Sequence, residues 1–201
     1  MKKVFLPVVM LLLFSFTTTT NSLSKTERKF ALSKLKDSKK HLQKAIKGLS
    51  TAQLNFKASP ESWSIAECTE HIAISESLIY GMFEEVLKQT PDPSKRSEVK
   101  FTDDQVWAMM INRTNKVKTQ EAFKPTGKFG SHENTVKEFV DKRDSHIDYI
   151  KKTDEDLRNR YQQLPFGTID GYQMILFLTG HTERHIAQIE EVKANPNFPK
   201  S

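Results

Sequence analysis

Two histidines one helical turn apart, His181 and His185, lie near the end of the chain. Residues four apart on an α-helix have Cβ atoms about 5–6 Å from one another, so both imidazoles can reach one ion. Helical spacing places the pair on or beside the apolar stripe of the last helix, where an imidazole loses water and needs a partner. A third histidine, His71, lies near the edge of the apolar stripe of an earlier helix. Three histidines that can converge inside a helical bundle favour a divalent metal as their common partner.

The chemistry of such a site follows from its ligands. Three neutral imidazoles without a compulsory thiolate suit zinc, nickel or another late divalent metal. Three protein ligands leave at least one coordination position open for water or substrate, as in catalytic metal sites. The spacing therefore predicts a metal site formed by His71, His181 and His185. The alternative for each histidine taken alone is a hydrogen bond to a backbone carbonyl or to a neighbouring acid.

Hydrolysis at such a site also needs a general base, and the nearby acids do not supply an obvious one. Glu183 lies between the two last-helix histidines, but its helical phase points it about 100° or more away from either. Glu67 lies one turn before His71 and is better explained by a capping box. We expect Glu70 and Glu76 to face solvent. No catalytic residue is assigned.

The remaining titratable candidates have ordinary explanations. Cys68 lies three residues before His71, but a buried free cysteine is more often an apolar filler. It is the only cysteine, so no intrachain disulfide can form. We expect His41, His132 and His146 to be solvated. The chain has no HExxH motif, no G-x-S-x-G motif and no phosphate-binding glycine-rich loop, which disfavours a zincin-type protease and the common serine-hydrolase and nucleotide-binding classes.

Four long helical patterns position these side chains. Each has apolar residues at helical spacing, and three open on a capping box. The patterns begin at Ser24, Ser64, about Ser131 and Asp170, and they end at Gly48, before Pro91, near Leu157 and before Pro196. The connection over residues 90–130 contains one shorter helical candidate, residues 102–116.

These patterns predict an all-α fold, a four-helix bundle with a long crossover between helices two and three. No strand-like alternation of useful length is present. The short Pro165-Phe166-Gly167 turn predicts that the third and fourth helices are antiparallel neighbours.

The first residues form a separate segment. Lys2 and Lys3 precede an apolar run over residues 4–16 and a polar stretch with small residues. The run is short for a bilayer, which needs about 20 apolar residues, and is typical of a secretory signal peptide. We therefore expect a signal peptide over residues 1–23, a bundle domain over residues 24–195 and a tail over residues 196–201. The protein would be exported, with no stable membrane association after cleavage, although an uncleaved anchor is an alternative.

The 201 residues carry a formal net charge of +6, which falls to +4 without Lys2 and Lys3. The other basic residues are mixed with acids along the chain, as on solvated helix faces. No basic block contains the aromatic residues that stack on bases, so the sequence disfavours nucleic-acid binding. The expected partner is a small-molecule substrate of unknown identity, and a homodimer is left open.

Two segments resemble the DinB-like (DinB/YfiT-like) family of metal-binding four-helix proteins. PESWSIAECTEHI, residues 60–72, is similar to the family's Pro-x-x-Trp-Ser-x-x-Glu-x-x-x-His element at the start of helix two. GHTERHIAQI, residues 180–189, is similar to its His-x-x-x-His-x-x-Gln-Ile element in the last helix. The two elements are more than a hundred residues apart and in the family's order. The similarity covers about residues 26–194.

The resemblance implies a metal-binding bundle whose ligands are His71, His181 and His185. Three functions remain open for such a site, and an exported metal-dependent hydrolase is the first. The others are a metal-binding or stress-associated protein without catalysis, and a thiol-dependent transferase that uses the same metal. The signal peptide departs from the many relatives that look cytoplasmic. Export disfavours the transferase, because reduced thiols are scarcer outside the cytoplasm.

Overall fold

The computed structural model describes residues 22–114 and 117–200. The predicted signal peptide therefore lies outside the described residues, apart from its last two positions. Of these, Leu23 is buried in the apolar core. Within the described ranges, none of the helices combines the length and the apolar character that a membrane span requires.

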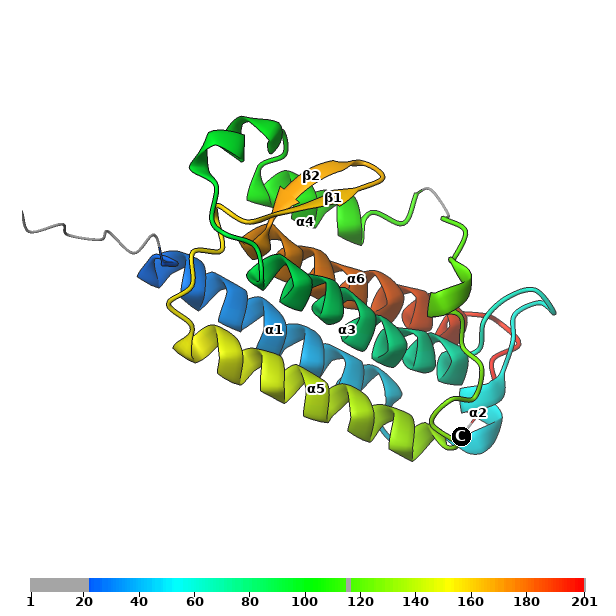
Figure 1. Cartoon of the computed structure of the whole chain (residues 1–201). Helices are drawn as coiled ribbons and strands as arrows, with labels where there is room; N and C mark the ends of the chain where they lie inside the picture. The colour runs from blue at the N-terminus through cyan, green and yellow to red at the C-terminus, as the bar shows by residue number, and fades with distance from the viewer. Residues whose placement is uncertain (1–21, 115–116, 201) are drawn as a thin grey trace, which may run out of the picture.

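Four long helices lie side by side and form the bundle (Figure 1). They are α1 (Lys25–Ile46), α3 (Ile65–Leu87), α5 (His132–Lys152) and α6 (Gly171–Lys193). Shorter elements connect them: α2 (Thr51–Asn55), the 3-10 helices η1 (Pro93–Glu98) and η2 (Glu121–Phe123), α4 (Asp103–Ile111), and a hairpin of β1 (Tyr161–Leu164) and β2 (Gly167–Asp170). The predicted fold class is confirmed, with one small hairpin added.

The predicted helix starts are confirmed by their capping boxes. Ser24, Ser64 and Asp170 each accept a hydrogen bond from the backbone N–H three residues on. The side-chain oxygen of that residue, a glutamate or glutamine, accepts a hydrogen bond from the backbone N–H of the capping residue. Each box satisfies two donors that a helix start otherwise leaves unpaired. Local chemistry therefore sets where α1, α3 and α6 begin.

The long helices follow one another around the bundle in the order α1, α5, α3, α6. The neighbours α3 and α5 run in the same direction, as do α1 and α6 (Figure 1). The two pairs run opposite to each other, so α3 and α6 are antiparallel neighbours. The prediction that the third and fourth helices are neighbours is wrong, because α5 and α6 lie diagonally across the bundle. The connection over residues 153–170 is long enough to cross it.

That connection also explains two other differences from the predicted elements. Helix α5 ends at Lys152, because Thr153 is extended, and Leu157 packs instead under the start of α6. The strands are four residues each, too short for alternation to stand out in the sequence. The shorter predicted helix exists as α4 but ends at Ile111, followed by an extended Asn112.

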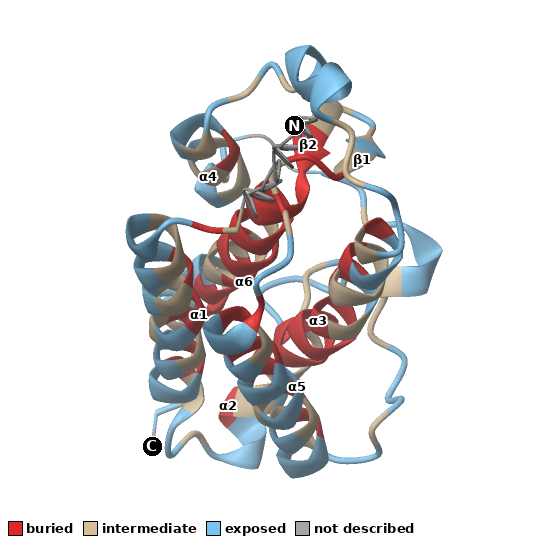
Figure 2. Cartoon of the chain, turned by 60° about the vertical axis from the view of Figure 1, so that its left-hand side comes forward, coloured by how far each residue is buried: buried red, intermediate tan, exposed pale blue. Residues whose placement is uncertain are grey.

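The buried residues lie on the sides of the long helices that face one another (Figure 2). They include two apolar clusters, one towards each end of the bundle. Between them lies a buried polar layer built on Arg143 of α5, which is fully buried. Its guanidinium binds Glu76 of α3 through two hydrogen bonds of 2.6 Å and also donates to Ser38 of α1 and Thr182 of α6. All four long helices meet at this one side chain. The expectation that Glu76 faces solvent is therefore wrong.

The same layer contains His146, which was also expected to be solvated. His146 is buried, stacks on Tyr80 at 3.4 Å between ring centroids, and lies with Nδ1 2.7 Å from Glu76. Burial alone would raise the pKa of Glu76, but the charge and hydrogen bonds of Arg143, with a smaller contribution from His146, hold it below its usual value. Glu76 is therefore ionised and compensated inside the protein.

The two other histidines outside the predicted site differ in exposure. His41 is exposed and lies 2.8 Å from Glu183, as its position among lysines suggested. His132 is half-buried, and burial lowers its pKa, so the expectation of a solvated side chain is wrong for it.

Candidate metal centre

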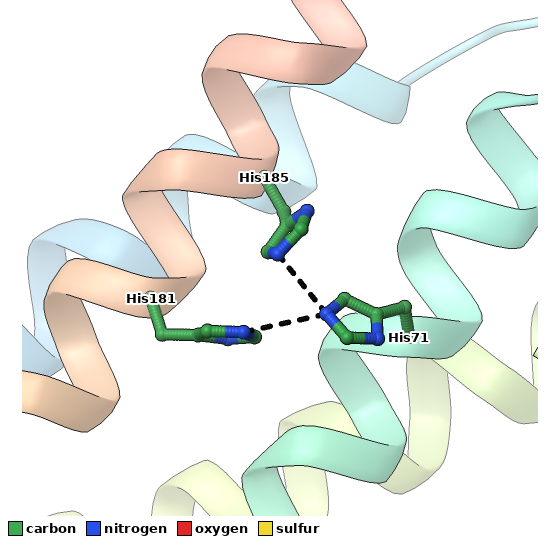
Figure 3. A group of neighbouring side chains, drawn as sticks. All are labelled: His71, His181 and His185. Atoms are coloured by element: carbon green, nitrogen blue, oxygen red, sulfur yellow. Dashed lines mark hydrogen bonds between the residues drawn. The ribbon is translucent and has the colours of Figure 1, made fainter. Parts of the chain in front are cut away.

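The antiparallel packing of α3 and α6 brings the three predicted histidines together. His71 lies in the second turn of α3, and His181 and His185 project from α6 towards it (Figure 3). Nε2 of His71 is 3.0 Å from Nε2 of His185 and 3.3 Å from Nε2 of His181. One nitrogen from each residue lies within 4.8 Å of the other two. The helical phases predicted this meeting.

Hydrogen bonds on the far side of two rings orient them. Nδ1 of His71 is 2.6 Å from the carbonyl oxygen of Phe123, an acceptor only, so Nδ1 carries the proton. Nδ1 of His185 is 2.9 Å from Oε1 of Gln188, an oxygen that also accepts from Arg113. In both rings Nε2 is therefore an unprotonated acceptor that faces the cluster. Two such lone pairs 3.0 Å apart repel unless a proton or a cation lies between them.

The spacing can be compared with that of a metal site. Two imidazole nitrogens on a tetrahedral zinc, each about 2.0–2.1 Å from the ion, are about 3.3 Å apart. The distance between Nε2 of His71 and Nε2 of His181 equals this value, and the distance between Nε2 of His71 and Nε2 of His185 is slightly shorter. Metal-binding histidines also typically donate their second N–H to a carbonyl or carboxylate oxygen, as His71 does to Phe123. The residues present therefore fit a late divalent metal.

Burial keeps these imidazoles neutral. It lowers the pKa of His71, and it lowers that of His181 well below the usual value, with the nearby His185 adding to the effect. The pKa of His185 falls to about 3 through burial and the proximity of His71. At neutral pH protons therefore do not occupy the nitrogen lone pairs, which stay free for a metal ion, as a metal ligand requires.

Aromatic side chains enclose the cluster on one side. The ring centroid of Trp63, which precedes the cap of α3, is 4.8 Å from that of His71 and 6.2 Å from that of His185. Phe123 of η2 lies 6.5 Å from His71. In the sequence, Trp63 is seen only as part of the motif that precedes helix two. Its proximity to His71 follows from the path of the chain before the cap of α3, and its proximity to His185 follows from the antiparallel contact of α3 with α6.

Glu70, the residue before His71, binds the backbone of the loop that follows η2. Both carboxylate oxygens accept backbone N–H groups, from Thr126 at 3.2 Å, Gly127 at 3.0 Å and Lys128 at 2.7 Å. Glu70 is buried, so the expectation that it faces solvent is wrong. Backbone donors have no signature in a sequence, which is why the pattern could not reveal this contact.

Three other predictions near the site are confirmed. Glu67 closes the capping box with Ser64 and also binds Lys57, so it is not directed at the histidines. Glu183 points to His41. Cys68 is fully buried in an apolar cluster, and burial raises the pKa of its thiol to about 12. It is a core residue.

A cleft of about 390 Å³ opens beside His185. Trp63 and Gln188 line it together with Arg113 and Arg184. Gln188 is the glutamine of the His-x-x-x-His-x-x-Gln-Ile element, and its contact with His185 follows from its place three residues later on the same helix face. Arg113 lies in the long connection and had no such signal.

A four-helix bundle with three inward-facing histidines between two of its helices defines a class of candidate metal proteins. The chain belongs to the DinB superfamily, whose family model matches residues 34–189. It is 28% identical over 149 residues to the uncharacterized protein YuaE of Bacillus subtilis strain 168. The aligned region covers 74% of this chain and 88% of that protein.

The fold is shared with a solved structure. YfiT from Bacillus subtilis, described as a probable metal-dependent hydrolase with an unusual four-helix bundle topology, aligns with a TM-score of 0.59 over 89% of this chain and 92% of that one. The sequence identity is 15%, so this likeness concerns the fold.

Proposed function

We propose that this protein is a metal-dependent hydrolase that holds one divalent ion on His71, His181 and His185. The observation that carries the proposal is the convergence of the three Nε2 atoms, with the protons of His71 and His185 directed away from the cluster. Zinc and nickel suit three imidazoles best. The description of YfiT as a probable metal-dependent hydrolase supports the same reaction class.

The protein's own groups have defined tasks in this proposal. When bound, a divalent ion with open coordination positions lowers the pKa of water and polarises a carbonyl. Phe123 and Gln188 orient His71 and His185 through their Nδ1 protons. Trp63 shields the two imidazoles from water, and the cleft beside His185 gives a substrate access.

The experiment is a measurement of metal content by elemental analysis on protein purified without chelator. We expect about one equivalent in the wild type and a loss of at least tenfold in occupancy for His185→Ala. His41→Ala is the matched control, because His41 is exposed and its ring contacts Glu183 and is not one of the three clustered imidazoles. A metal-free wild type, or full occupancy in His185→Ala, contradicts the site assignment.

The reaction is tested next, on loaded and chelated protein, with ester, amide and thiol-conjugation substrates. A hydrolase cleaves esters or amides only when loaded. A thiol-dependent transferase is the second candidate, because none of the described hydrogen bonds of the three histidines goes to a carboxylate that could act as base. Loaded protein without any turnover would favour a metal-binding role without catalysis.

Export through the predicted signal peptide is part of the proposal and has its own test. The N-terminal residue of the protein recovered from cells, determined by mass spectrometry, is expected to lie near residue 24. A chain that keeps Met1 contradicts cleavage.

A further inference from the structure

The cleft beside His185 contains an arginine whose guanidinium already holds a carboxylate. Nε of Arg113 donates to Glu191 at 2.8 Å, and Nη2 donates to the second oxygen of the same carboxylate at 2.7 Å. The side chain of Arg113 is only 19% exposed, whereas that of Glu191 is 60% exposed. The guanidinium is therefore set into the wall of the cleft, and the carboxylate approaches it from the solvent side.

The same guanidinium is connected to the histidine cluster. Nη1 of Arg113 donates to Oε1 of Gln188 at 3.4 Å and to the carbonyl oxygen of Arg184 at 3.3 Å. Oε1 of Gln188 also lies 2.9 Å from Nδ1 of His185. One amide oxygen thus links the arginine to a cluster histidine, and both groups line one cleft.

We propose that Arg113 is the binding site for the carboxylate of a small-molecule ligand, and that Glu191 fills this position when the ligand is absent. The proposal rests on the proposed function, because it assigns a substrate class to the same site. The ligand is a carboxylate with an apolar body, which lies along the cleft between Arg113 and the histidines.

Three physical features support this assignment. The planar fork of arginine matches a carboxylate in two parallel hydrogen bonds. An incoming carboxylate can take the place of Glu191 on this guanidinium and accept the same two hydrogen bonds, while the Glu191 side chain, which is 60% exposed, returns to water. The apolar surfaces of Trp63, Val117 and Val192 line the cleft and can contact an apolar body.

The test uses benzoate as the probe and benzamide as its neutral counterpart, with binding measured by calorimetry on the purified metal-loaded protein. Arg113→Gln is expected to weaken benzoate binding about tenfold, because a charge-assisted bidentate pair is lost. Glu191→Gln is expected to strengthen it severalfold, because the competing carboxylate is gone. Neither substitution should change the binding of benzamide.

Two controls match the charge changes. Lys137→Gln removes a positive charge from the exposed face of α5, and Glu190→Gln removes a negative charge next to Glu191, where Glu190 pairs with Lys193. Both should leave benzoate binding unchanged. Because Glu191 is exposed, its substitution tests the proposal even if Arg113→Gln disturbs folding.

The same titrations in His181→Ala separate this inference from the proposed function. If the dependence on Arg113 persists in that variant, the carboxylate site exists independently of the ion. If Arg113→Gln has no effect, if Glu191→Gln weakens benzoate, or if benzamide binds as tightly as benzoate, the proposal is wrong. Failure of the metal site itself is read separately, from the metal content of the wild type.

Discussion

Glu70 and His71, neighbours in α3, bind two points of the same connection between α4 and α5. His71 donates from Nδ1 to the carbonyl oxygen of Phe123, and Glu70 accepts the backbone N–H groups of residues 126–128. The carboxylate fixes the loop, and the loop fixes the imidazole. Glu70 is therefore a positioning residue for His71.

Glu70→Gln is expected to lower the affinity for Zn²⁺ about tenfold, since outer-shell partners of metal ligands typically contribute 10–100-fold. The amide has one acceptor oxygen in place of two and brings an NH₂ donor against the backbone donors. Competition with a chromophoric chelator measures the affinity. Glu84→Gln, on an exposed turn of the same helix, is the control and should bind like the wild type. An unchanged affinity in Glu70→Gln would show that the loop does not orient His71.

Breaking the buried polar layer should be costly. Arg143→Met leaves Glu76 charged without its main partner, and loss of one member of a buried ion pair costs about 3–5 kcal/mol. Urea unfolding measures the free energy of unfolding. Lys137→Met, on the exposed face of the same helix, should change it by less than about 0.5 kcal/mol. The double variant Arg143→Met/Glu76→Gln should recover part of the loss, and a double variant less stable than Arg143→Met would contradict this account.

Gly180 allows α4 to lie directly against α6, one residue before His181. A Cβ atom at this position would be 2.8 Å from Cβ of Met110. Gly180→Ala should therefore push α4 outward, cost about 1–3 kcal/mol, and weaken metal binding through His181. Gly81→Ala is the matched control, because a Cβ there meets nothing within 4 Å, and it should stabilise α3 by about 0.5–1 kcal/mol. Thermal unfolding distinguishes the two, and equal effects would refute the close approach.

Cys68 should be unreactive in the folded protein. With a thiol pKa of about 12, the thiolate is scarce at pH 8, and its fraction rises only as pH approaches that value. Burial also excludes the reagent. Reaction with Ellman's reagent at pH 8 should be at least a hundredfold slower than in 6 M guanidinium chloride, where the pKa returns to about 8.5. Fast labelling of the native protein would show that the apolar cluster around the start of α3 opens readily.

The histidine cluster was predictable because it depends on helical phase and on two motifs far apart in sequence. The i, i+4 spacing of His181 and His185 fixes their common face, and the stripe of α3 places His71 towards it. The groups that hydrogen-bond to the cluster and to its supporting loop were harder to predict from the sequence. The carbonyl of Phe123 and the N–H groups that bind Glu70 belong to backbone, and every residue has those groups.

The buried ion pair was missed for a different reason. Glu76 and Arg143 compensate each other, and two opposite charges on separate helices look like solvated residues in a sequence. Arg143 did carry a signal, because it lies four residues from Phe139 and four from Ile147, both of which are buried. The diagonal placement of α5 and α6 was missed because the short turn lies inside a hairpin and does not join the helices directly.

The parallel course of the neighbours α3 and α5 has a consequence for how this scaffold can diversify. Two adjacent helices that point the same way require the chain to travel back along the whole bundle between them. That return segment, residues 88–131, carries Arg113 at the cleft, Phe123 against His71 and the loop held by Glu70. The three histidines belong to the helices, and the cleft wall belongs in part to the return segment. Exchange of that segment alone would give the same three histidines a different ligand pocket while leaving the four long helices unchanged.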